Sequence, residues 1–318
     1  LTGLSRAGIM QFCFEQDGDH YIVIEPNSDE GVAFVEINPE KKEITGYNPV
    51  HRIYQGYGKE AGFSGHFVIQ LNEEIADYGV WDSTTVTPGL KSAKGQKHNV
   101  GAWVKLASDK PGKTLVKVAT SFTSIDNARK NLAAEIPGWN FNEVRQASSD
   151  IWNQALGQIA VKGNNEKEKV KFYSALYNAH FLPRTFSDVD GSYPRFDGDG
   201  QIMKMDHGTY YCDFSQWDTY RAVHPLFSIL TPSRNGDMAH SLVSKGQQGG
   251  WLPIFPSWNS YTAAMIGDHC IAMIGDAIVK DTPGFDYEEA YTLMRKNAFE
   301  ANPDSNSYRD GKGRRAME

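Results

Sequence analysis

The apolar residues of this chain change their spacing near residue 124, and this change limits the architectures that the sequence can adopt. From about residue 7 to 122, apolar and polar side chains alternate in short segments, and the breaks between them are rich in Gly, Asn, Asp, Pro and Lys. A period of two with frequent turn residues predicts antiparallel strands, arranged as a β-sandwich. The clearest segments are residues 20–26, 31–38, 63–71, 99–106 and 114–122.

After residue 124 the spacing becomes helical. Amphipathic segments follow one another to residue 299, and Asp286 with Glu289 predicts a capping box at the start of the last one. Long loops rich in Gly and Pro separate these segments, which favours a helical barrel over a tight bundle. The expected helices are residues 124–136, 142–159, 166–182, 215–230, 236–246, 262–280 and 286–299.

These patterns predict a multidomain β + α chain. We expect a β-sandwich domain at residues 1–123, linker helices at 124–160, and the first part of a helical barrel at 161–318. The chain opens without an initiator Met or a signal-peptide pattern and ends without a closing element, so both ends are expected to be cut.

Composition excludes several classes of function. The net charge of −7, with acidic and basic residues interspersed, leaves no basic footprint for nucleic acid and no polybasic membrane anchor. The longest apolar run, residues 263–279, contains Asp268, His269 and Asp276, and therefore predicts a buried helix rather than a membrane span. Three scattered cysteines lack the spacing of a zinc or redox motif, and we expect them to be packing residues.

Residues 211–226 combine carboxylates, an arginine, a histidine and large aromatics. Ser215 is expected to cap a helix, with Asp218 at its third position. In that helix Trp217, Arg221 and His224 would share one face, and the arginine would hold the carboxylate ionised. Such a face suits a hydroxylated ligand. An Asp and Arg pair at a helix start is also a common structural device, so site and scaffold both stay open.

A second candidate is the loop at residues 247–261 with the segment that follows it. Glycines and prolines stiffen this loop, which displays Trp258 and Asn259 among other aromatic and polar residues, a composition typical of sugar-binding clefts. Asp268 and His269 are expected inside the next helix. An unpaired charge there costs several kcal/mol, so Asp268 needs an ion-pair partner or a ligand, and His269 is either a core histidine or a site residue.

A third candidate, residues 182–211, is rich in aspartate and glycine. Its four aspartates superficially resemble a calcium loop, but the EF-hand spacing with its closing Glu is absent, so a solvated loop is the expectation. The residues concerned are Asp188, Asp190, Asp197 and Asp199.

Four long segments, in order along the chain, closely resemble glycoside hydrolase family 92, the calcium-dependent exo-α-mannosidases. They are residues 121–145, 171–198, 217–232 and 249–270. The resemblance implies a β-sandwich packed on an (α/α)6 barrel, with the active site between them. It also implies inverting hydrolysis of terminal α-mannosides such as those of N-glycans. One carboxylic acid protonates the leaving oxygen, one carboxylate activates water, and Ca²⁺ engages mannose hydroxyls.

The resemblance also assigns residues. Trp217, Asp218 and Arg221 match the family's WD-x-x-R helix, where the Asp looks like a ligand of a mannose hydroxyl. The matching cleft-lining or supporting positions are Trp258, Asn259, Asp268 and His269. Glycan-processing enzymes meet their substrates outside the cytoplasm, so the resemblance implies an extracellular or periplasmic location in a bacterium.

The sequence departs from the family in one respect. The family's general acid Glu, general base Asp and main calcium ligands lie in motifs of the EGNxWQY and GNDD type, and neither motif occurs in residues 1–318. We therefore expect the catalytic pair beyond Glu318, assign no metal ligand in this chain, and expect the lone polypeptide to be inactive. The alternatives are a non-catalytic carbohydrate-binding fragment and another (α/α)6 glycosidase.

Overall fold

The structure is a computed structural model that describes residues 1–300 except 27, 54–57, 98, 199, 263 and 266; of residues 28–30 and 97 it describes only the backbone. The chain divides into two compact units, each described here by itself. The first contains Leu1–Val50, Phe63–Trp152 and Asp188–Asp190. The second contains His51–Gly62, Asn153–Ser187 and Gly191–Glu318. The domain bounds at residues 123 and 160 stay a prediction.

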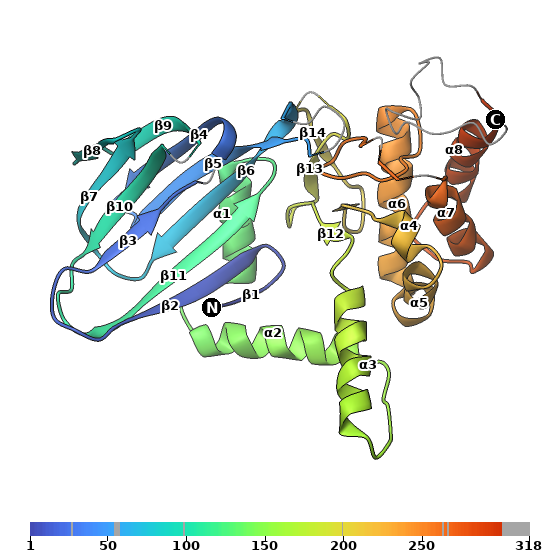
Figure 1. Ribbon diagram of the computed structural model, residues 1–318, viewed down its shortest axis with the longest axis horizontal. Helices are drawn as coiled ribbons and strands as arrows, with labels where there is room; N and C mark the ends of the chain where they lie inside the picture. The colour runs from blue at the N-terminus through green and yellow to red at the C-terminus, as the bar shows by residue number, and fades with distance from the viewer. Residues whose placement is uncertain are drawn as a thin grey trace. The chain divides into compact units, whose positions relative to one another are not determined.

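Two sheets form the sandwich (Figure 1). Strands pair antiparallel within each sheet, as where β11 runs between β2 and β6. The larger sheet has the order β1 (Thr2–Gly3), β2 (Ala7–Phe14), β11 (Gly112–Ser121), β6 (Glu60–Leu71), β5 (Glu43–His51), β4 (Ser28–Asn38), β9 (Ser92–Lys97). The smaller has the order β3 (Tyr21–Ile24), β10 (Val100–Leu106), β7 (Ile75–Asp82), β8 (Thr85–Pro88). The five strands expected from alternation are confirmed as β3, β4, β6, β10 and β11.

Both faces of the larger sheet are covered, and alternation along β11 shows how. Val116 and Val118 point into the sandwich core, which they share with residues of both sheets, such as Val35 and Val104. Ala119 points to the other face, where α1 (Ile125–Glu135) supplies a second core. Successive side chains of a strand face opposite ways, so one strand serves both layers.

Asp188 belongs to the first unit, where its carboxylate is buried. Asp188 is 4% exposed and accepts hydrogen bonds from Ser121 Oγ (2.9 Å), Asn131 Nδ2 (2.7 Å), Asn127 Nδ2 (3.1 Å) and the Thr123 hydroxyl. The expectation of a solvated loop is therefore wrong at this position. The donors satisfy the carboxylate, which a buried charge requires.

The other aspartates of the 182–211 segment differ from one another. Asp190 pairs with Lys130 at 3.1 Å, and Asp197 pairs with Arg52 at 2.7 Å. Asp199 lies outside the described residues. Asp190 and Asp197 thus each form an ion pair with a different basic side chain, and they do not form a common calcium loop.

The second unit is mainly helical. Helix α6 lies against α5, α7 and α8, and together they enclose a core that includes Phe227, Leu242, Ile274 and Leu293. The helices are α2 (Phe141–Leu156, shared between the units), α3 (Glu166–Ala179), α4 (Gln216–Thr219), α5 (Val223–Leu230), α6 (Pro232–Gly249), α7 (His269–Val279) and α8 (Tyr287–Phe299). Two short ribbons pair β12 (Arg184–Thr185) with β15 (Tyr211–Cys212), and β13 (Ser192–Pro194) with β14 (Ile202–Lys204). No described helix combines the length and the apolarity that a membrane crossing needs.

Two helix boundaries correct the sequence-based expectation. The helix expected at 215–230 is broken into α4 and α5, because Pro225 lacks a backbone N–H and its ring clashes with the carbonyl four residues earlier. The helix expected at 262–280 begins only at His269, since Met265 and Gly267 have φ values of 67° and 92°, which no right-handed helix accommodates.

The cap of the last helix and the burial of the three cysteines were also predicted from the sequence. Asp286 accepts a hydrogen bond from the Glu289 N–H at 3.0 Å, which confirms the cap of α8. Cys212 and Cys270 are buried, whereas Cys13 is exposed, so the packing role is wrong for Cys13.

A fully buried lysine lies in the core of the second unit. Lys245 Nζ donates to the Tyr211 carbonyl at 2.6 Å and lies 3.6 Å from the centre of the Tyr210 ring. Burial lowers the pKa of the Lys245 ammonium to about 8, and the carbonyl with the aromatic ring compensates only part of the lost hydration.

This lowered pKa predicts a pH dependence of stability. Between pH 8 and the normal lysine pKa of about 10.4, the unfolded chain keeps the proton that the folded chain releases, so stability rises with pH in that window. Lys245→Met removes the titrating group. Urea denaturation measures the free energy of unfolding at pH 7.5 and at pH 10. Between these pH values it should rise by about 1 to 3 kcal/mol more in the wild type than in the variant. If the difference in unfolding free energy between wild type and Lys245→Met were the same at both pH values, the pKa of Lys245 would not be lowered by folding.

Candidate active site

Four side chains from α4, the turn after it and the start of α7 form a partly exposed platform: Trp217, Tyr220, Arg221 and His269. The His269 ring stacks on Tyr220 with centroids 4.3 Å apart and meets the edge of Trp217 at 5.0 Å. The Arg221 guanidinium lies 4.4 Å from the Tyr220 ring centre and 4.9 Å from that of Trp217. The platform therefore joins aromatic surface, a cation and an imidazole in one patch.

The loop before α7 gives His269 its position. Gly267 has a φ of 92°, and a Cβ there would lie 2.7 Å from His269 Nε2, so only glycine lets the backbone close on the imidazole. Asp268 occupies the N-cap of α7, rather than a place inside a helix, and its side chain makes no capping hydrogen bond. Asp268 and His269 of the GDH motif thus lie at the start of α7, where His269 forms part of the platform.

Asp218 projects from the same short helix as Trp217. Its exposed carboxylate accepts a hydrogen bond from the Ser215 hydroxyl. Ser215 occupies the N-cap position as expected, but its side chain makes no capping hydrogen bond to the helix backbone. The expected pairing with Arg221 is wrong, because the guanidinium donates to the Trp217 carbonyl at 3.0 Å and lies over the platform rings. The carboxylate remains open to solvent for a ligand.

His224 does not share this surface. The break between α4 and α5 turns its ring inward, where it is 1% exposed and its Nδ1 lies 3.4 Å from Asn235 Oδ1. Burial lowers the pKa of His224 to about 4, so the ring is neutral at physiological pH. The prediction that His224 shares a face with Trp217 and Arg221 is therefore wrong.

The other two predicted site residues lie in a second cluster. Trp258 is partly exposed; its ring faces the Arg184 guanidinium at 4.8 Å, and its backbone N–H donates to Asp213 Oδ1 at 2.9 Å. Asp213 also accepts from Arg184 Nε at 2.7 Å. Asn259 is 1% exposed, with its amide bound to the Tyr210 hydroxyl and the Pro194 carbonyl. The geometry of Asn259 is that of a supporting residue.

Sequence reasoning did not single out Tyr220, Arg184 or Asp213 as candidate site residues. Tyr220 lies within the WDTYR segment but was not among the matched motif positions, and only its stacking on His269, 49 positions away, places it in the platform. Arg184 reaches Asp213 from 29 positions away, and nothing in the local sequence signals that pair.

The described residues do not fit a calcium ion. Ca²⁺ takes six to eight oxygen ligands. Within the described part of the chain, the side chains that gather as potential metal ligands in a group of three or more are Asp206, His207 and His240, two of which offer nitrogen. The oxygens of Asp188, a buried carboxylate of the 182–211 segment, already accept four hydrogen bonds. We derive no step through calcium.

Comparison with known proteins gives a consistent result over both units. The glycosyl hydrolase family 92 N-terminal domain model matches residues 1–121, and the catalytic domain model of the same family matches residues 127–318. A curated relative, an uncharacterized secreted glycosidase of Arthroderma benhamiae, is 26% identical over 203 residues, which are 62% of this chain and 22% of the relative.

Two solved structures share the fold. A family 92 inverting mannosidase of Bacteroides thetaiotaomicron superposes with a TM-score of 0.83 at 23% identity, covering 95% of this chain and 40% of its own. A family 92 α-mannosidase of the same organism gives a TM-score of 0.83 at 29% identity, covering 94% and 40%. The chain thus spans about 40% of the length of these enzymes.

These superpositions confirm the predicted fold class, an N-terminal antiparallel β-sandwich followed by part of an (α/α)6 helical barrel. The two domain models follow one another along the chain in the order expected from the resemblance. Because the catalytic model alone matches more than half of the 318 residues, the chain belongs to glycosyl hydrolase family 92.

Proposed function

We propose that this chain acts within an inverting exo-α-mannosidase that releases terminal mannose from α-mannosides such as N-glycans. Its family consists of glycosidases, and the α-mannosidase that is 29% identical supports mannose as the sugar. That enzyme has also been solved in complex with mannoimidazole. The Arthroderma relative is named a secreted glycosidase, which supports an extracellular location; the periplasm stays the alternative that the resemblance implies.

The exposed Asp218 carboxylate next to the platform carries the proposal. A pyranose presents C–H groups on its faces and hydroxyls around its edge, so it needs an aromatic surface and a nearby acceptor. The platform supplies Trp217 and Tyr220, and Asp218 supplies two carboxylate oxygens on the same short helix. We assign Asp218 to a mannose hydroxyl and the platform to the face of the ring.

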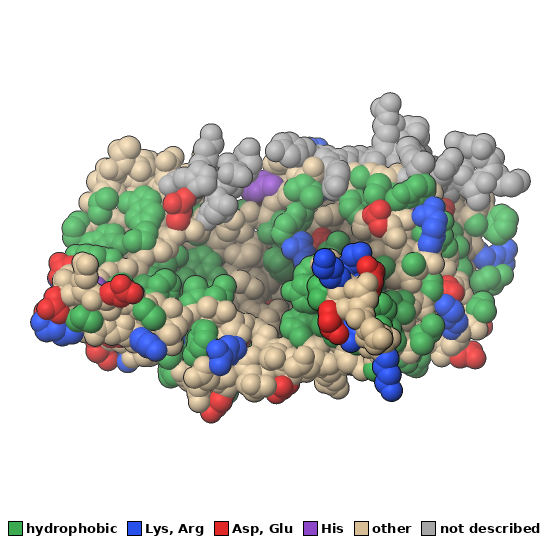
Figure 2. All heavy atoms as spheres, turned by 60° about the horizontal axis from the view of Figure 1, so that its bottom comes forward, with side chains coloured by type: hydrophobic (Ala, Val, Ile, Leu, Met, Phe, Trp, Pro, Cys, Tyr) green, Lys and Arg blue, Asp and Glu red, His purple; other side chains and the backbone are tan. Residues whose placement is uncertain are grey.

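A neutral sugar also matches the surface charge. On the face shown in Figure 2, acidic and basic side chains are interspersed rather than gathered by sign. Such a surface does not concentrate a strongly charged ligand. The glycan is therefore expected to bind by shape and hydrogen bonding.

Bond cleavage needs more than this platform. An inverting glycosidase places an acid and a base about 6.5–9.5 Å apart so that water fits between base and sugar. We assign neither role to a residue of this chain, and we propose that calcium, as the resemblance implies, acts in the complete enzyme. The part played by residues 217–221 and 269 is to hold and orient the terminal mannose.

A panel of aryl α-glycosides tests the proposal on the full-length protein that carries this chain. The α-mannoside should be hydrolysed, the α-glucoside and α-galactoside should not, and a chelator should abolish the reaction. Cleavage of another sugar would indicate a different (α/α)6 glycosidase. Saturable mannoside binding without hydrolysis would indicate a carbohydrate-binding protein.

A further inference from the structure

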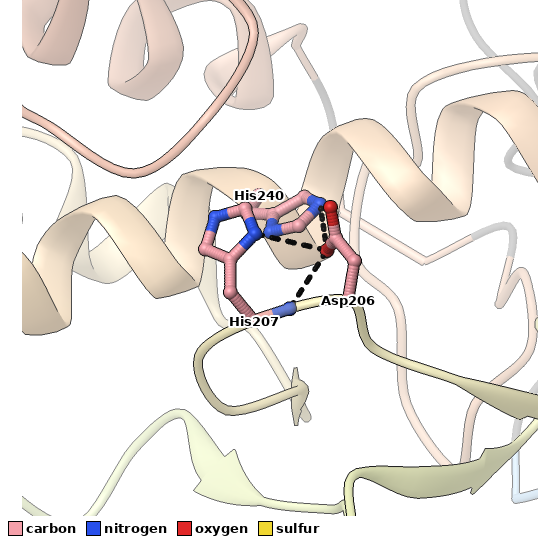
Figure 3. Close-up of side chains that lie close together, drawn as sticks. All are labelled: Asp206, His207 and His240. Atoms are coloured by element: carbon pink, nitrogen blue, oxygen red, sulfur yellow. Dashed lines mark hydrogen bonds and ion pairs between the residues drawn. The ribbon is translucent and has the colours of Figure 1, made fainter.

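Two histidines and an aspartate of the second unit converge outside the platform. Asp206 and His207 lie on the loop that follows β14, and His240 projects from α6 toward them (Figure 3). The two imidazole rings stack with centroids 4.6 Å apart, and one carboxylate oxygen of Asp206 faces both of them. These three residues are named the His–Asp cluster.

The ligand atoms have nearly the separations that a tetrahedral metal needs. With bonds of about 2.0–2.1 Å, the ligands of Zn²⁺ lie about 3.3 Å from one another. Asp206 Oδ1 lies 3.0 Å from His207 Nδ1 and 3.7 Å from His240 Nε2, and the three ligand atoms all lie within 4.8 Å of one another. Shifts of about 1 Å or less would bring them around one ion.

The protonation of His207 is set by its second nitrogen. Nε2 lies 3.1 Å from the Gly284 carbonyl, an acceptor, so Nε2 carries a proton. Nδ1 faces the Asp206 carboxylate at 3.0 Å, and a metal ion bound there would take the place of the Nδ1 proton. Metal-binding histidines are oriented in this way by a carbonyl or carboxylate behind the ring.

A clamp holds the loop on α6. Asp237, one helical turn before His240, accepts the Thr209 N–H at 3.0 Å. Gly208 has a φ of 70°, and a Cβ there would lie 2.2 Å from Asp237 Oδ1, so glycine lets the loop close on the helix. The clamp fixes His207 over His240 before any ion arrives, and the carboxylates of Asp206 and Asp237 make the surroundings favourable for a cation.

We propose that the His–Asp cluster binds one Zn²⁺ or a similar late first-row divalent cation through His207 Nδ1, His240 Nε2 and Asp206 Oδ1, with water as the fourth ligand. Two imidazoles and one carboxylate suit this class of metal and not Ca²⁺, which prefers oxygen alone. The ion joins the β14 loop to α6 and is separate from the calcium proposed for catalysis.

Zinc binding by the untagged 318-residue chain tests the proposal. After chelator treatment and desalting, titration against a chromophoric zinc indicator should give one bound equivalent, and Co²⁺ should give the visible absorption of a four-coordinate site. His240→Ala and Asp206→Asn should each weaken Zn²⁺ binding about tenfold or more and abolish that absorption. Cys13→Ser and His51→Ala, which change an exposed thiol and a histidine outside the cluster, should bind as the wild type does.

Circular dichroism and thermal melts without metal show whether each variant still folds. Zn²⁺ should raise the melting temperature of the wild type and leave that of His240→Ala unchanged, because a ligand stabilises only the fold that binds it. A wild type that binds no zinc, or a His240→Ala variant that binds it as tightly, would overturn the proposal.

Discussion

Replacing Asp218 with alanine in the full-length enzyme should lower kcat/KM for an α-mannoside about 10- to 100-fold. A hydrogen bond to an ionised carboxylate contributes about 1.5–3 kcal/mol, and its partner here is a sugar hydroxyl. The fold should tolerate the change, because Asp218 is exposed and accepts its hydrogen bond from Ser215 at the end of a four-residue helix. Steady-state kinetics on an aryl α-mannoside measures the effect.

Ser215→Ala is the matched control for this substitution. It removes the same hydrogen bond from the other side and leaves the carboxylate in place. If Asp218 contacts the sugar, Ser215→Ala keeps most of the activity while Asp218→Ala loses it. If the two variants lose activity equally, Asp218 acts by shaping α4, and the assignment to a mannose hydroxyl is wrong.

Asp188→Ala should lower the free energy of unfolding by about 3 kcal/mol or more. The substitution leaves the hydroxyl and amide donors of four residues without their shared acceptor in a buried site: Ser121, Thr123, Asn127 and Asn131. Each unsatisfied buried donor costs about 1–3 kcal/mol, and local rearrangement recovers part of the sum. Urea denaturation followed by far-UV circular dichroism measures the change.

Asp190→Ala provides the comparison, since it lies two residues away on the same segment. Its ion pair with Lys130 is partly exposed, with the Lys130 side chain 57% exposed, and ion pairs open to solvent contribute about 1 kcal/mol or less. We therefore expect a large loss of unfolding free energy for the substitution at position 188 and a small one at 190. Similar losses at both positions would show that the segment, rather than the buried carboxylate, determines the stability.

The sequence predicted elements well where the signal is local. Strict alternation identified β10, in which Val100, Ala102, Val104 and Leu106 are buried, because one strand face must reach the core. The cap at Asp286 was predictable for the same reason, since a cap depends on residues three positions apart.

The missed boundaries had local signals too. Pro225 stood inside the helix expected at 215–230, and Gly267 stood near the start of the one expected at 262–280. In both cases the helical spacing of apolar residues outweighed a residue that interrupts helices. Giving proline and glycine precedence would have placed both breaks.

The arrangement of the candidate site was not predictable in the same way. The contact of Tyr220 with His269 and the donors around Asp188 join residues about 50 to 67 positions apart. The aspartate-rich segment looked solvated because its composition is that of loops, and only the fold reveals the donors. Resemblance to the family assigned Trp217, Asp218 and His269 to one site, and the structure shows how α4 and the start of α7 bring their backbones together.

Time-resolved proton NMR of α-mannoside hydrolysis by the full-length enzyme tests the central claim most directly. The account predicts that mannose is released from the non-reducing end and that the β-anomer accumulates first, because water attacks the face opposite the leaving group. Initial release of α-mannose, release of a different sugar, or no release at all would contradict it.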